Sequence, residues 1–111
     1  MGYELYSELQ AKVKQLDVSI KQLRINGTNY AEAEKRYKIL LRSKCLELRD
    51  SGMAIGMIDK TCYGIPEVAE ARFQRDVADT VYKANLEAIN SIKLQMRLLE
   101  NQIQREWGKE R

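Results

Sequence analysis

The chain has 111 residues, of which 32% are charged and 44% hydrophobic, and it carries a formal net charge of +3 at pH 7. This length suits one domain over residues 1–111, and the composition is typical of packed amphipathic helices rather than of a disordered chain. The chain has no histidine, which removes the most common general acid–base group and zinc ligand. We therefore expect a protein that is not an enzyme and that holds no cofactor or metal.

The longest uncharged stretch runs only from Ser51 to Ile58, which is too short for a transmembrane helix. The first residues lack the basic start and apolar centre of a signal peptide. Cys45 and Cys62 are too few to form a disulfide framework, and neither has the histidine partner that a nucleophilic thiol commonly uses. These features predict a cytoplasmic protein without a membrane partner.

The first predicted element is a helix from Tyr3 to Ile25. Its apolar residues recur every three or four positions, as on one side of a helix: they are Leu5, Leu9, Val13, Leu16, Ile20 and Leu23. Asn26-Gly27 predicts a helix end, because both residues tolerate the left-handed conformation. Asn29 and Glu32 have the spacing of a capping box that would start the next helix. We expect two consecutive helices here, with a kink as the alternative.

The second predicted helix runs from about Tyr30 to Asp50 and ends at Gly52. A short connector helix is expected between Met53 and Tyr63. Gly64 would close it, and Pro66 is well placed in the first turn of a further helix.

The last predicted helix runs from Pro66 to about Trp107, because no proline or glycine interrupts this segment. Its length of roughly 60 Å exceeds that of either earlier helix. The simplest packing lays the first helix against its C-terminal half and the second helix against its N-terminal half. The sequence therefore predicts an all-α protein: an antiparallel helical hairpin or bundle with two consecutive N-terminal helices, a short connector helix and one long C-terminal helix.

An apolar flank of the last helix would remain poorly covered by a single partner helix. It comprises Leu86, Leu94 and Leu98. Because large exposed apolar patches are rare on monomers, we expect a homo-oligomer with this flank at its interface. Alternatively, the connector helix or Tyr3 and Tyr6 cover the flank. Trp107 is expected to clip the last helix onto the start of the first one, near these two tyrosines.

Basic residues gather on the second predicted helix, close to one helical line. Such a line can engage the phosphates of a nucleotide or a nucleic acid, and a nearby tyrosine can stack on a base. The candidate phosphate-binding residues are Lys35, Lys38, Arg42 and Arg49, followed by Lys60 and Tyr63 in the connector. The alternative is a solvated face, or one that pairs with Asp76 and Asp79 across the bundle.

Five segments carry a resemblance to a known group of proteins: residues 30–37, 48–53, 73–78, 87–90 and 97–100. Together they resemble small helical early-region proteins of temperate phages and prophages of low-GC Gram-positive bacteria. The likeness extends over nearly the whole chain. Its motifs are helix-packing patterns, so there is no catalytic residue to carry over.

The resemblance implies a phage-encoded binding protein that acts in the cytoplasm of a bacterial host cell. The first function it implies is counter-defence, by sequestering a host immune nucleotide signal or a host effector protein. This function needs only binding sites at sufficient concentration. The alternative is a nucleic-acid-binding accessory protein of phage recombination or replication, which suits the basic line.

Overall fold

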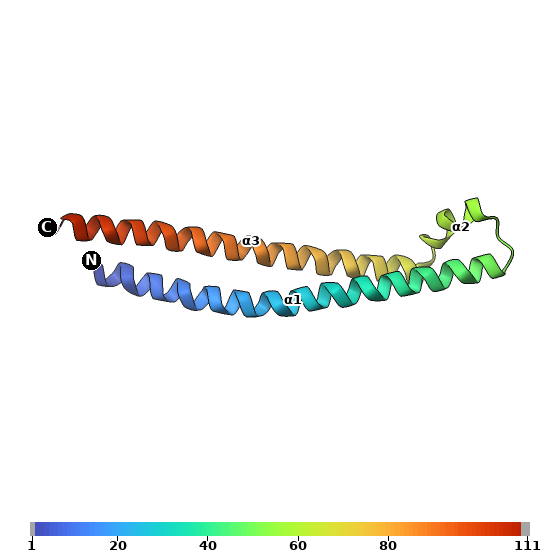
Figure 1. Ribbon diagram of the computed structural model, residues 1–111, viewed down its shortest axis with the longest axis horizontal. Helices are drawn as coiled ribbons and strands as arrows, with labels where there is room; N and C mark the ends of the chain where they lie inside the picture. Colours follow the sequence, from blue (N-terminus) through green and yellow to red (C-terminus); the bar gives the residue numbers. More distant parts are fainter. Residues whose placement is uncertain (1, 110–111) are drawn as a thin grey trace. The chain divides into compact units, whose positions relative to one another are not determined.

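The computed structural model describes residues 2–109 of the chain. They form three helices, α1 (Gly2–Asp50), α2 (Ile55–Cys62) and α3 (Pro66–Lys109) (Figure 1). This confirms the all-helical fold, the short connector helix and the long C-terminal helix. No helix within residues 2–109 is both long enough and apolar enough to cross a membrane.

The chain divides into two compact units. Unit 1 pairs the part of α1 up to Ile25 with the part of α3 from Lys83 onward, and unit 2 comprises residues 26–82. The expected pairing of helix segments is therefore correct. Each long helix contributes to both units.

The predicted break at Asn26-Gly27 is wrong, because α1 continues through it as one helix. Asn26 is buried, and a Cβ atom on Gly27 would lie only 3.4 Å from Cε2 of Tyr82. Of the described residues, only Gly52 has a positive φ angle. Packing against α3 thus outweighs the local tendency of this dipeptide to end a helix.

Most buried and half-buried residues of both long helices recur at alternating spacings of three and four, which is the heptad pattern of a coiled coil. We call these residues the seam. On α1 they are Gly2, Leu5, Leu9, Lys12, Leu16, Ser19, Leu23, Asn26, Tyr30, Ala33, Tyr37, Leu40 and Lys44. On α3 they are Val68, Ala71, Arg75, Ala78, Tyr82, Asn85, Ile89, Ile92, Met96, Leu99, Ile103 and Glu106.

The seam of unit 1 differs from the predicted apolar stripe. Lys12 and Ser19 occupy seam positions, whereas Val13 and Ile20 are exposed. The heptad spacing places these polar residues inward, and the side-chain amide of Asn85 donates a hydrogen bond to the backbone oxygen of Ser19 (3.2 Å). The spacing of the repeat, and not hydrophobicity alone, selects which residues face the partner helix.

Gly52 marks the end of α1 and Pro66 begins α3, as expected. Gly52 has a φ of +89°, and its N–H bonds to the oxygen of Arg49 while the N–H of Met53 bonds to that of Leu48. This is the Schellman arrangement that satisfies the last carbonyl groups of a helix. Pro66 is the first residue of α3, where its missing N–H costs nothing.

The short helix α2 packs on the seam of unit 2 and forms a core there. Tyr37, Cys62 and Val68 are its buried members. Partly buried apolar residues surround them: Leu40, Leu41, Cys45, Leu48, Ile65 and Ala71. Unit 2 therefore has three helical segments around its core.

Candidate binding surfaces

On the side of α1 that faces away from the seam, five of the seven positions spaced seven residues apart carry a cation, and the other two are Ser7 and Thr28. Lys35 lies two residues from the seam residues Ala33 and Tyr37, which is about 200° around the helix from either. We call this series the outer line. It contains Lys14 and Lys21 in unit 1 and Lys35, Arg42 and Arg49 in unit 2, and all five are exposed.

The corresponding positions of α3 carry no cation. They are Phe73, Thr80, Glu87, Leu94 and Asn101. Coiled-coil helices usually carry mixed charges on their solvated side, and α1 departs from this by having five cations and no carboxylate on its outer line. The basic character is therefore specific to α1.

The predicted basic residues of unit 2 all lie on the exposed surface. Lys38 stands beside the outer line and forms an ion pair with Glu34 (Nζ to Oε1, 3.6 Å). Asp76, one of its two predicted partners, instead accepts hydrogen bonds from Arg75, the shorter being 2.8 Å. A guanidinium nitrogen of Arg75 also lies 3.7 Å from Oε1 of Glu34.

A shallow hollow lies beside the outer line in unit 2. It is lined by Glu32, Lys35, Arg36 and Ile39, all from α1. Arg36 was not among the predicted site residues, although it follows Lys35 directly. Because one helix surface forms the hollow, a small ligand there would keep much of its surface in water, unlike a ligand in an enclosed pocket.

Lys60 and Tyr63 lie in or next to α2, and both are exposed. The guanidinium carbon of Arg72 stands 5.8 Å from the ring centroid of Tyr63. This cation–π contact occupies one face of the ring. Stacking of a base on Tyr63 would have to use the other face or displace Arg72.

A cluster of aromatic and charged side chains in the seam of unit 2 was not predicted. The rings of Tyr30 and Tyr82 stack with their centroids 6.2 Å apart, and the Tyr30 hydroxyl donates a hydrogen bond to Glu34 (3.1 Å). This bond to a carboxylate raises the pKa of Tyr30 above its usual value. The guanidinium carbon of Arg75 lies 4.6 Å from the ring centroid of Tyr37. These contacts satisfy polar groups between the two long helices.

The two cysteines also lie together. The Cys45 thiol donates a hydrogen bond to the Cys62 sulfur, with 3.1 Å between the sulfur atoms. Burial raises the pKa of Cys62 to about 11. A thiol that stays protonated at neutral pH is a poor nucleophile, so the pair is better suited to packing α2 onto α1 than to covalent chemistry.

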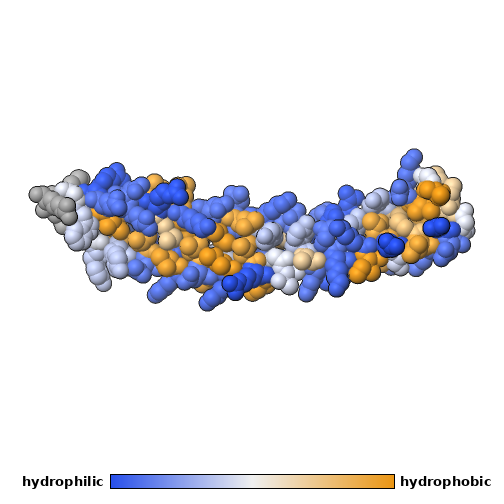
Figure 2. All heavy atoms as spheres, in the orientation of Figure 1, coloured by the Kyte–Doolittle hydropathy of each residue, from blue (hydrophilic) through white to orange (hydrophobic). Residues whose placement is uncertain are grey.

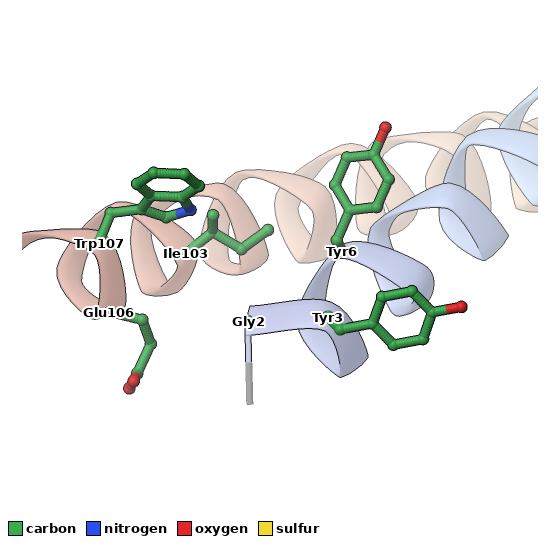
Figure 3. Close-up of a pocket in the computed structure, with 6 residues that line it drawn as sticks. All are labelled: Gly2, Tyr3, Tyr6, Ile103, Glu106 and Trp107. Atoms are coloured by element: carbon green, nitrogen blue, oxygen red, sulfur yellow. The ribbon is translucent and has the colours of Figure 1, made fainter. Parts of the chain in front are cut away.

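Unit 1 has an aromatic hollow at its end, lined by Gly2, Tyr3, Tyr6, Ile103, Glu106 and Trp107 (Figure 3). Trp107 does share this hollow with both tyrosines, but its side chain lies next to Ile103 while the rings of Tyr3 and Tyr6 point away from it. All three aromatic residues remain exposed. The expected contact of Trp107 with the start of α1 therefore leaves an open apolar surface at this end of unit 1.

The three leucines predicted to form an interface do not share one strip. Leu86 is half-buried and directly follows the seam residue Asn85, whereas Leu94 is exposed on the side opposite the seam. Leu98 is also exposed, and it lines a second hollow of unit 1 together with Glu8 and Lys12. Leu86 therefore belongs to a different surface from the other two.

Within residues 2–109 there is no group of three or more potential metal ligands. Comparisons with protein family models, with curated proteins and with solved structures find no match for this chain.

Proposed function

We propose that this chain is a non-catalytic binding protein whose outer line on α1 contacts the phosphates of a nucleic acid. The observation that supports this is the series of five lysine and arginine residues on the outer line, with no carboxylate at these positions and no cation on the matching side of α3. Contacts of this kind neutralise phosphates without reading bases.

The spacing of the outer line favours a long polyanion over a small ligand. Neighbouring members seven residues apart are separated by about 10 Å along the helix, as between Lys35 and Arg42. A nucleic acid presents phosphates along its whole length, so it can meet several members at once. A mononucleotide would reach only one or two of them.

A second candidate function is sequestration of a nucleotide signal, the counter-defence role that the resemblance to phage proteins implies. The hollow beside Lys35 and Arg36 favours it, because two cations flank a space that could admit a phosphate group. Both candidates place the protein in the cytoplasm of a bacterial host cell.

Charge reversal on α1 distinguishes the two candidates. Each charge-assisted contact contributes about 1.5–3 kcal/mol, so Lys35→Glu with Arg42→Glu should weaken nucleic-acid binding by more than about a hundredfold. Lys14→Glu with Lys21→Glu should also weaken it if the ligand is a long polyanion, and should leave the binding of a mononucleotide unchanged. The measurement is fluorescence anisotropy with a labelled oligonucleotide and with a labelled nucleotide.

A matched control makes the same change in net charge at two positions outside the outer line, Arg97→Glu with Arg105→Glu on α3. Its affinity should stay within a few-fold of the wild type. Wild-type affinity should fall steeply as salt rises, because bound phosphates release their counterions. A wild-type protein that binds neither probe at low salt, or a Lys35/Arg42 variant that retains full affinity, would show that the proposal is wrong.

A further inference from the structure

A mostly apolar strip lies next to the seam of unit 1. Its members each follow a seam residue by one position, and we call them the unit 1 flank: Tyr6, Val13 and Ile20 on α1, and Leu86, Lys93, Glu100 and Trp107 on α3. The three α1 members are 56%, 36% and 38% exposed. In Figure 2, hydrophobic side chains gather along the line between the N-terminal part of α1 and the C-terminal part of α3.

The width of the apolar surface is greater than a two-helix pair needs. Two-stranded coiled coils use two apolar positions in every seven, whereas helices of a bundle use a third position beside them. On α1 of unit 1, this third position is apolar in each of three successive heptads, at Tyr6, Val13 and Ile20. This pattern is typical of a helix that contacts two neighbours.

Unit 2 shows what covers the same positions elsewhere in the chain. Leu41 and Leu48 stand at the corresponding heptad positions of α1, and both pack against the core that α2 completes. The Cys62 thiol of α2 lies 3.5 Å from the backbone oxygen of Leu41. A third helix therefore covers this flank in unit 2, and no described residue of unit 1 belongs to such a helix.

The flank of unit 1 is complementary to itself. Tyr6 and Ile103 line the same hollow from opposite helices, so Val13, seven residues further along α1, lies level with Met96 of the antiparallel α3. Lys93 and Glu100 lie on α3 on either side of that level. The flank thus has a valine at its midpoint and opposite charges at nearly equal distances from it.

We propose that two copies of this chain associate through the unit 1 flank about a twofold axis that passes by Val13. The rotation places Val13 against Val13 of the partner subunit and Tyr6 against Ile20 of the partner subunit. Lys93 lies against Glu100 of the partner subunit. The twofold symmetry forms a second, identical pair between Glu100 and Lys93 of the partner subunit. Isologous contacts of this type require such self-complementarity.

The resulting arrangement is a four-helix bundle in which every neighbouring pair of helices is antiparallel. Leu86 lies against Trp107 of the partner subunit at each end of the α3 pair. The third apolar position of each heptad is then covered in unit 1 as it is in unit 2. In four-helix bundles, the side chains of neighbouring helices interdigitate at the positions that the heptad pattern specifies.

The first test places a charge on the twofold axis. Val13→Glu brings two carboxylates together in an apolar contact, so it should raise the dimer dissociation constant by more than about a hundredfold. Sedimentation velocity at micromolar concentrations gives the mass, and circular dichroism reports whether the helices persist. A wild-type protein that sediments as a monomer would overturn the proposal.

The second test uses the charged pair and does not depend on the apolar contact. Lys93→Glu alone should weaken the dimer by about tenfold, because two like-charged pairs replace two ion pairs. Glu100→Lys alone should have a similar effect. The double variant should recover the wild-type dissociation constant, because the exchanged charges face each other again across the axis. Failure of this recovery would contradict the twofold arrangement.

The matched control concerns Leu94 and Leu98, which are exposed but lie off the unit 1 flank. Leu94→Glu with Leu98→Glu should leave the dimer intact. If this variant becomes a monomer while Val13→Glu remains a dimer, the chain associates through the outer side of α3 instead, and the proposed interface is wrong.

Discussion

Units 1 and 2 share one heptad pattern but differ in how much they bury. Among the described residues, unit 2 contains five buried hydrophobic residues, Ala33, Tyr37, Ile58, Cys62 and Val68, whereas unit 1 contains two, Ile89 and Ile92. Two of the five belong to α2. The comparison shows that a seam between two helices encloses little by itself and that a third helix creates the core.

The largest expected effect comes from truncating one tyrosine in each unit, Tyr37 in unit 2 and Tyr6 in unit 1. Tyr37 is 5% exposed and Tyr6 is 56% exposed. Tyr37→Ala should lower the free energy of unfolding by about 3–5 kcal/mol, the usual cost of deleting a buried aromatic ring. Tyr6→Ala should cost less than about 1 kcal/mol in the isolated chain.

Urea denaturation followed by circular dichroism measures both variants, at protein concentrations low enough to keep a single chain. Raising the concentration sharpens the comparison, since Tyr6→Ala should then become more costly if the unit 1 flank is covered by a second copy. Equal effects of the two substitutions at low concentration would contradict the difference between the units.

Smaller effects are expected from substitutions of two glycines: Gly27, which lies inside α1, and Gly52, which lies just beyond its end. Gly27→Ala should raise stability by about 0.5–1 kcal/mol, because alanine favours a helix interior and its Cβ would make ordinary contact with Tyr82. Gly52→Ala should lower stability by about 1 kcal/mol, since its φ of +89° strains any side chain.

Thermal melting of the two variants provides the measurement. Their opposite signs are the informative result, because each glycine belongs to a dipeptide or turn that could end a helix. Destabilisation by Gly27→Ala would indicate that Tyr82 packs too closely against residue 27 to accept a Cβ atom.

A further expected effect is a pH dependence of stability that arises in unit 2. The pKa of Cys62 rises from 9.0 to about 11 in the folded chain, so folding favours the protonated thiol. Its contribution to stability should be complete below pH 9 and should disappear as the pH rises towards about 11. The difference in unfolding free energy between the wild type and Cys62→Ala isolates this contribution from those of all other groups. A difference that stays constant from pH 8 to 11 would contradict it.

Much of the fold could be predicted from helix-ending residues and periodicity. Gly52 and Pro66 have the local chemistry that ends and begins helices, so these boundaries were predicted correctly. Asn26-Gly27 has similar local chemistry, yet the heptad repeat continues through it from Leu23 to Tyr30. Following the seven-residue spacing across the dipeptide would have indicated one helix, because the repeat reflects packing against α3.

The binding surfaces were predicted less completely. Lys35 and Arg42 were recognised because they lie in a segment rich in basic residues, whereas Lys14 and Lys21 share their register but stand in a mixed segment. The contact between Cys45 and Cys62 depends on how α2 folds back, and no spacing in the sequence specifies this. The leucine flank was predicted from apolarity alone, which could not separate Leu86 from the other two leucines.

The contact between Gly27 and Tyr82 has a consequence for the alignment of the hairpin. Two helices with a regular seven-residue repeat can slide past each other by one repeat and still match apolar positions. Such a slip would move Tyr82 from Gly27 to the level of Ile20 or Glu34, where a side chain fills the space that the ring needs. The absence of a bulky side chain at Gly27 therefore favours one alignment of α1 with α3 in unit 2 over the others that the repeat alone would allow.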